Sequence, residues 1–154
     1  MKTFATIILF MLLTNACATR NAFESFNITQ EQAKSEDSIL NVKIHKGEKI
    51  TGVMSAIYLN RVLSKEYKDN EYFYIILYDR HKKTKEKIKF LLNGKEAISV
   101  EVLEAKNRFS NLISSNSDWK LYYLVTFKEQ GSKLKLKVKI AKHKSDKLLF
   151  KKDN

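Results

Sequence analysis

The stretch KLKLKVKI, residues 133–140, decides how the chain folds, because lysine and aliphatic side chains alternate in it without a break. Successive side chains of a β-strand point to opposite faces of the sheet, so this stretch has one apolar face and one lysine face. Such strands are typical of antiparallel sheets with one side on the core and the other in water. The sequence therefore predicts a half-buried strand.

The residues before this strand show a similar alternation. Residues 119–128 read WKLYYLVTFK, and the four residues EQGS connect them to residue 133. A short glycine-containing connection between two alternating stretches is typical of a β-hairpin. We therefore expect these two strands to pair with each other.

Further strands are expected upstream. Residues 72–79, YFYIILYD, are apolar on both faces, as in a strand buried between two layers. The Asn-Gly pair at 93–94 indicates a tight hairpin turn. We expect strands at 72–79, 88–92 and 98–102 to form a meander, after a first strand at 39–44.

Residues 50–67 are open to two interpretations, a strand or a helix. Their apolar positions form no single stripe at helical spacing, which favours a strand at least over residues 50–59. A short helical turn is expected around residues 109–113. The expected fold is all-β or mainly β, an antiparallel sandwich or barrel of seven to eight strands with at most one short helix.

The N-terminus has the pattern of an export signal. Lys2 is followed by the apolar run FATIILFMLL at residues 4–13. A helix that spans a bilayer needs about 20 apolar residues, so this run is too short to remain as a membrane anchor. We expect residues 1–16 to be a signal peptide.

The only cysteine of the chain lies directly after this signal. The stretch LTNAC resembles the lipobox of bacterial lipoproteins, with Ala16 and Cys17 matching and Thr14 where leucine is usual. The relaxed box and the lysine-rich, proline-free composition resemble spirochaetal outer-surface lipoproteins. The resemblance implies acylation of Cys17 by fatty acids such as palmitate, and an anchor in the bacterial outer membrane that exposes the protein at the cell surface. The other interpretation is a plain secretory signal that leaves a free thiol.

Residues 17–38 comprise the cysteine expected to be lipidated and a stretch with few apolar side chains, which is expected to be a disordered tether. Phe23, Phe26 and Ile28 leave open a short helix packed on the domain. Residues 39–154 form the expected single β domain, which has no second cysteine for a disulfide.

Positive charge is concentrated in two segments of a chain whose net charge is +12. Residues 133–154 carry nine lysines against two aspartates, and residues 80–95 carry seven basic residues against one glutamate. These segments suggest a surface for a polyanion or an acidic protein, such as a host protein or a glycosaminoglycan. The alternative is that the lysines only keep a sheet edge soluble. The predicted contact residues are Lys133, Lys135, Lys137, Lys139, Lys82, Lys83 and Lys85.

Nucleic acid is an unlikely partner, because arginine, which reads bases and phosphates bidentately, occurs at only four positions. The tyrosines are better explained by core packing than as base-stacking platforms.

No catalytic, metal-binding or cofactor-binding motif is present in the sequence. His45, His81 and His143 are far apart and lie among lysines, as expected for solvated imidazoles. We therefore expect no enzyme and no cofactor, but a lipid-anchored surface protein that acts by binding. The alternative function is that of a periplasm-facing envelope lipoprotein with a structural or inhibitory role.

Overall fold

The computed structural model describes residues 29–79, 88–114 and 116–152 of the chain. In chain order the elements are α2 (Gln30–Ser38), β1 (Leu40–Lys46), β2 (Lys49–Tyr58), α3 (Leu59–Val62), β3 (Asn70–Asp79), β4 (Ile88–Leu92), β5 (Lys95–Glu96), β6 (Ser99–Leu103), the 3₁₀ turn η2 (Ser110–Leu112), β7 (Leu121–Lys128), β8 (Lys133–Ile140), β9 (His143–Ser145) and β10 (Leu148–Lys151).

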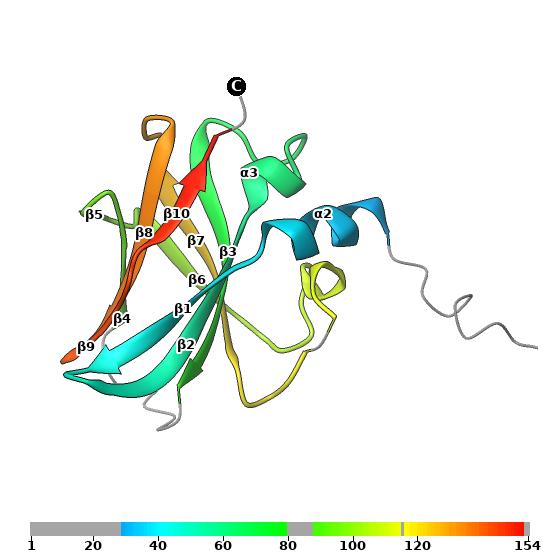
Figure 1. The fold of residues 1–154 in the computed structure, drawn as a ribbon. Helices are drawn as coiled ribbons and strands as arrows, with labels where there is room; N and C mark the ends of the chain where they lie inside the picture. Colours follow the sequence, from blue (N-terminus) through cyan, green and yellow to red (C-terminus); the bar gives the residue numbers. More distant parts are fainter. Residues whose placement is uncertain (1–28, 80–87, 115, 153–154) are drawn as a thin grey trace, which may run out of the picture.

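The ten strands of the described residues form one antiparallel sheet that curls into a half-barrel (Figure 1). The strand order is β5-β4-β8-β9-β1-β2-β3-β7-β6, and β10 pairs with β8 beside β9. The expected mainly β, antiparallel class is confirmed, but the described residues contain two short helices, α2 and α3, where at most one was expected. The fold is not a sandwich of two sheets, because a single sheet curls until its two sides face each other.

The main core lies inside the curl. Strand β8 contributes the four aliphatic side chains of the alternating stretch, Leu134, Leu136, Val138 and Ile140, all of them buried. Aromatic rings from β2, β3 and β10 meet them. The ring centroid of Phe73 lies 5.1 Å from that of Tyr58 and 5.2 Å from that of Phe150. The predicted half-buried strand is therefore confirmed, with its apolar face on this core.

A second core covers the outer face of β2, β3 and β7. Tyr74 and Tyr122 stack there with ring centroids 6.2 Å apart, and Phe109 from the η2 region packs on Tyr74. Short helix α3 and the loop around η2 supply the remaining cover. This explains why the stretch predicted as a doubly buried strand, now β3, is apolar on both faces.

The expected hairpin between 119–128 and 133–140 is wrong. Strand β7 pairs with β3 and β6, whereas β8 pairs with β4, β9 and β10. Alternation fixes which side chains face the core but carries no information about which strand lies alongside. The connection at residues 129–132 therefore joins two strands that both contribute to the main core but do not pair with each other.

The expected meander is wrong for the same reason, because β3 has β2 and β7 as neighbours while β4 pairs with β5 and β8. The strand number of seven to eight is also too low. Strands β5, β9 and β10 have two to four residues each, too few for a recognisable alternation. Residues 49–58 are a strand, as favoured, and η2 matches the expected helical turn.

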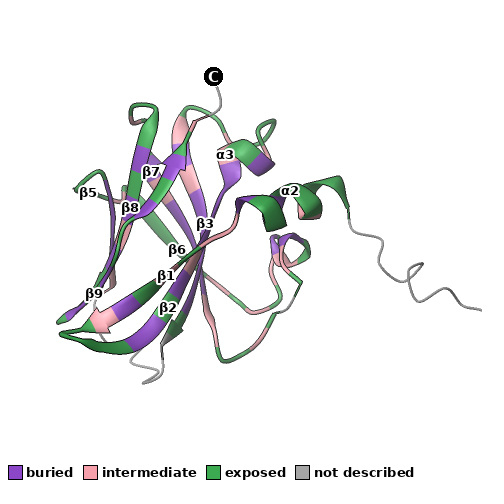
Figure 2. Cartoon of the chain, in the orientation of Figure 1, coloured by how far each residue is buried: buried purple, intermediate pink, exposed green. Residues whose placement is uncertain are grey.

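The segment expected as a disordered tether contains a helix over its last residues. In α2 the N-cap residue Thr29 accepts a hydrogen bond at its Oγ1 from Gln32 N at 3.1 Å. Buried Ser35 donates from its Oγ to Leu112 O at 2.7 Å. The helix is held by polar contacts and remains largely exposed (Figure 2), which is why its composition suggested disorder. Residues 17–28 lie outside the described residues.

Among the described residues, none of the helices has the length and apolar character to cross a bilayer.

Phe73→Ala is expected to lower the free energy of unfolding by about 4 kcal/mol, because it removes a fully buried ring from the centre of the main core. Urea unfolding followed by circular dichroism measures the change. The matched control, Leu149→Ala, alters a side chain that is 63% exposed and should change stability by less than about 0.5 kcal/mol. Equal losses in the two variants would contradict the assignment of the core.

Candidate functional site

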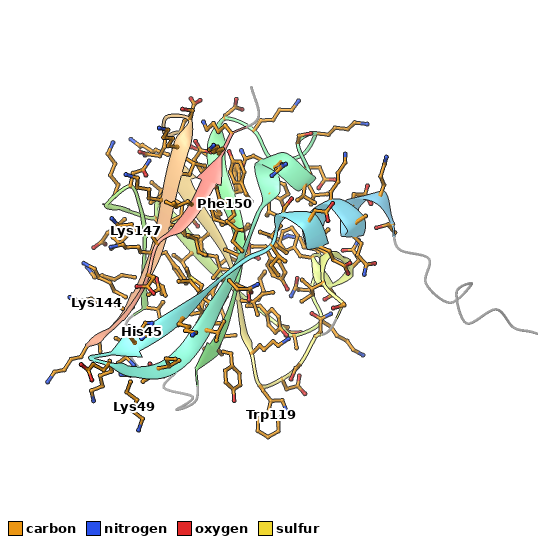
Figure 3. The ribbon with its side chains drawn as sticks, in the orientation of Figure 1. His45, Lys49, Trp119, Lys144, Lys147 and Phe150 are labelled. Atoms are coloured by element: carbon orange, nitrogen blue, oxygen red, sulfur yellow. The ribbon has the colours of Figure 1, made fainter. Side chains whose placement is uncertain are left out.

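The outer face of β4, β8, β9 and β10 carries a group of lysines. The side chains opposite the buried residues of β8 point outward, and lysines of the neighbouring strands lie beside them. Figure 3 shows Lys144 and Lys147 pointing away from the sheet, whereas Phe150 of the same chain segment lies inside the fold. We call this group the lysine array: Lys89, Lys133, Lys135, Lys137, Lys139, Lys144, Lys147 and Lys151.

Several lysines of the array lie directly opposite one another. Lys139 is the cross-strand partner of both Lys89 on β4 and Lys144 on β9. At the other end of β8, Lys133 is the partner of Lys151 on β10. Like charges in opposite positions on neighbouring strands destabilise a sheet. The arrangement therefore has an electrostatic cost in the unliganded protein.

Almost none of this charge is compensated within the described residues. Lys89 forms an ion pair with Glu96, with 2.5 Å between Nζ and Oε1. The other seven lysines of the array form no ion pair with any residue that the structure describes. The surface along β8 consequently has a strong positive potential.

A groove of about 600 Å³ runs along this surface. All four lysines of β8 line it together with Lys147, and its apolar floor includes Leu91. The turn at Asn93 and Gly94 forms one wall. Both residues have positive φ, +50° and +87°, as in the tight hairpin turn that an Asn-Gly pair favours.

Asn93 fixes this wall against β8. Its backbone N–H donates to Lys135 O at 3.0 Å, and its Oδ1 accepts from Lys135 N at 2.9 Å. Its Nδ2 donates to Lys133 O at 3.1 Å. The groove therefore has a rigid backbone frame, and only the long lysine side chains are free to adapt.

The structure brings together four of the predicted contact residues, Lys133, Lys135, Lys137 and Lys139, on one groove. Lys82, Lys83 and Lys85 lie outside the described residues, as does Cys17. The prediction did not select Lys89, Lys144, Lys147 and Lys151. The charge of residues 133–154 was visible in the sequence, but recognising these lysines as neighbours requires the pairing of β4, β9 and β10 with β8.

The histidines differ in their surroundings. His45 Nε2 lies 3.5 Å from Asp146 Oδ2 at the surface. The expectation of a solvated imidazole is wrong for His143, which is buried with its Nδ1 2.8 Å from Thr51 Oγ1. His143 is the cross-strand partner of Ile140 and thus shares its inward face. His81 lies outside the described residues, and no group of three potential metal ligands occurs among those described.

The tyrosines support the core-packing interpretation. Tyr74, Tyr122 and Tyr123 are buried, and burial raises the pKa of Tyr74 to about 12. These rings are not accessible for stacking on bases. Tyr72 is half-buried, and Tyr78 has 47% of its surface exposed.

A second hollow, of about 440 Å³, lies at the end of the half-barrel where β10 ends. The carboxylate of Glu71 is fully buried there. It accepts hydrogen bonds from Tyr58 Oη at 2.6 Å and Gln130 N at 2.8 Å, and it pairs with Lys152 Nζ at 2.7 Å. These contacts connect β3 to the chain segments that follow β7 and β10.

This site stabilises the protonated form of Lys152. Partial burial lowers the pKa of Lys152, but hydrogen bonds and charge interactions with Glu71 and Glu129 outweigh it and raise the pKa overall. The Glu71 carboxylate is engaged by Tyr58, Gln130 and Lys152 of the same chain. We therefore interpret this hollow as a site that stabilises the fold and not as a binding site.

No family model, no curated protein and no solved structure matches this chain.

Lys152→Met is expected to lower the free energy of unfolding by about 3 kcal/mol at neutral pH, because the Glu71 carboxylate is then buried without a cation. The double variant Glu71→Gln/Lys152→Met should recover most of the loss. Urea unfolding measures both, with Lys106→Met as the control at an exposed lysine outside the array.

The same variant should show a defined pH dependence. Since the folded-state pKa of Lys152 is raised above its ordinary value of 10.5, the pair stabilises the protein below that pH. The difference between wild type and Lys152→Met should shrink as the pH rises through the folded-state pKa. A difference that stays constant at alkaline pH would contradict the ion pair.

Proposed function

We propose that this protein is a lipid-anchored bacterial surface lipoprotein that binds a host extracellular macromolecule through the lysine array. Among the candidate partners, we favour an anionic polysaccharide. The observation that carries the proposal is the two opposed pairs Lys133–Lys151 and Lys139–Lys144, which no carboxylate of the described residues neutralises. A polyanion would relieve this repulsion and gain charge-assisted hydrogen bonds from the ammonium groups. The proposed role is binding and not catalysis.

The position of β8 argues against the simpler explanation of the lysines. Lysine protects exposed sheet edges from pairing with other chains. However, β8 is not an edge strand, because β4 lies on one side of it and β9 and β10 lie on the other. Edge protection therefore does not account for four successive outward lysines on this strand.

The lysine array and the N-terminal side of the described chain lie on opposite sides of the fold, as expected for a protein tethered by its N-terminus. The described chain begins at α2, which lies at the opposite end of the view from β4, β8 and β9 (Figure 1). An anchor attached on the α2 side would leave the lysine array turned away from the membrane. This orientation would leave the array accessible to a partner, and it depends on acylation of Cys17.

The residue type indicates the class of ligand. Lysine ammonium groups are compact point charges, whereas the planar guanidinium of arginine is the group suited to bidentate contacts with phosphates and base edges. The two arginines among the described residues, Arg61 and Arg108, do not line this groove. This composition favours a sulfated or carboxylated polymer over a nucleic acid, so we place glycosaminoglycans before other host partners.

The triple variant Lys135→Glu/Lys137→Glu/Lys139→Glu is expected to elute from a heparin column at clearly lower salt than the wild type, because it reverses charge along the centre of the groove. The control Lys65→Glu/Lys106→Glu/Lys128→Glu changes the net charge equally at exposed lysines outside the array. If both variants elute alike, only net charge matters and the site is wrong.

Cys17→Ser is expected to move the protein from the membrane fraction to the soluble fraction, because the thiol that carries the acyl chains is gone. Mass spectrometry of the native protein should show lipid on Cys17. Protease added to intact cells should digest the wild-type protein. If digestion begins only after the outer membrane is breached, the periplasm-facing alternative is correct.

A further inference from the structure

Building on the function proposed above, we propose that the lysine array takes a linear polyanion that lies parallel to β8 and contacts both ends of the strand. A compact anion, or a polymer that crosses the strands, would use only part of the array.

Positive charge is continuous along β8. Lys133, Lys135, Lys137 and Lys139 occupy alternate positions, so neighbouring ammonium groups start from Cα atoms about 7 Å apart. The row is about 20 Å long from the first lysine to the last. All four side chains line one groove, which therefore extends along the whole row.

Across the strands, positive charge is interrupted near the middle of β8. The cross-strand partner of Lys137 on β4 is Leu91, and that of Lys135 on β10 is Leu149. At the β4 side of the array, Glu96 pairs with Lys89. A polymer that crosses β8 near its middle would place anionic groups on leucine, and one that crosses at Lys139 would meet a carboxylate.

The two ends of the row carry additional lysines. Lys133 and Lys151 form the β10 end, and Lys139 and Lys144 form the hairpin end, next to the turn between β8 and β9. A chain of about 20 Å or more can contact both ends. Once one end is bound, binding at the other is intramolecular, so affinity should rise steeply at the length that spans the row.

The test uses heparin-derived oligosaccharides of defined length, from the disaccharide upward, titrated into the intact protein in detergent. Affinity is expected to rise by more than about tenfold between fragments shorter and longer than the row, and to change little beyond it. The variants Lys133→Gln/Lys151→Gln and Lys139→Gln/Lys144→Gln should each weaken binding of long fragments by about tenfold. Each should also reduce the slope of log affinity against log salt by about two.

The shortest fragment serves as the internal control, because it reaches only one end. Either double variant should therefore bind it within about twofold of the wild type. The variant Lys65→Gln/Lys106→Gln, with the same change in charge outside the array, should bind long fragments as the wild type does.

Two results would overturn the parallel arrangement while leaving the proposed function intact. If Lys133→Gln/Lys151→Gln binds long fragments normally, the polymer crosses the strands at the hairpin end. If affinity does not depend on length, the array holds a compact anion. If the wild-type protein binds no fragment and is not retained on heparin, the parallel arrangement and the proposed function are both wrong.

Discussion

The fold and the candidate site depend on the burial of one face of β8. Leu134, Leu136 and Val138 are fully buried in the main core, which leaves the strand no freedom to rotate about its axis. The intervening lysines must then point outward in a straight row. The same packing that stabilises the half-barrel therefore positions the charges, and the row is rigid at its Cα atoms even though its side chains are flexible.

The site also depends on how β10 is held. Phe150 packs on Phe73 and lies near Tyr58, with ring centroids 5.2 and 6.2 Å away, so that its neighbours Leu149 and Lys151 face outward. The next residue after β10, Lys152, pairs with buried Glu71. These contacts fix the strand that supplies the β10 end of the array. The buried ion pair thus supports the site from the opposite face of the sheet, without belonging to it.

The sequence allowed the strands to be predicted, but not their neighbours. The alternation at residues 133–140 and the doubly apolar stretch at 72–79 are local patterns, and both correspond to strands with the expected faces. Pairing is decided by contacts between distant residues, such as Phe90 beside Val138, which leave no local pattern. This is why four lysines of the array were found on one strand, while Lys144 and Lys151 were recognisable only as basic residues. Ser35 of α2 shows the same limit, because its hydrogen bond to Leu112 O holds a segment whose composition suggests disorder.

A comparison of two free energies, the repulsion between opposed lysines and the burial of aliphatic side chains, explains how the sheet tolerates the lysines. A like-charged cross-strand pair costs a few tenths of a kcal/mol to about 1 kcal/mol, and salt screens exposed pairs further. Burying each aliphatic side chain on the inner face of β8 contributes about 1.5–3 kcal/mol. Four such side chains outweigh the three opposed lysine pairs in the array. The strand can therefore present largely uncompensated charge without losing its place in the sheet, and a bound polyanion would relieve the repulsion that remains.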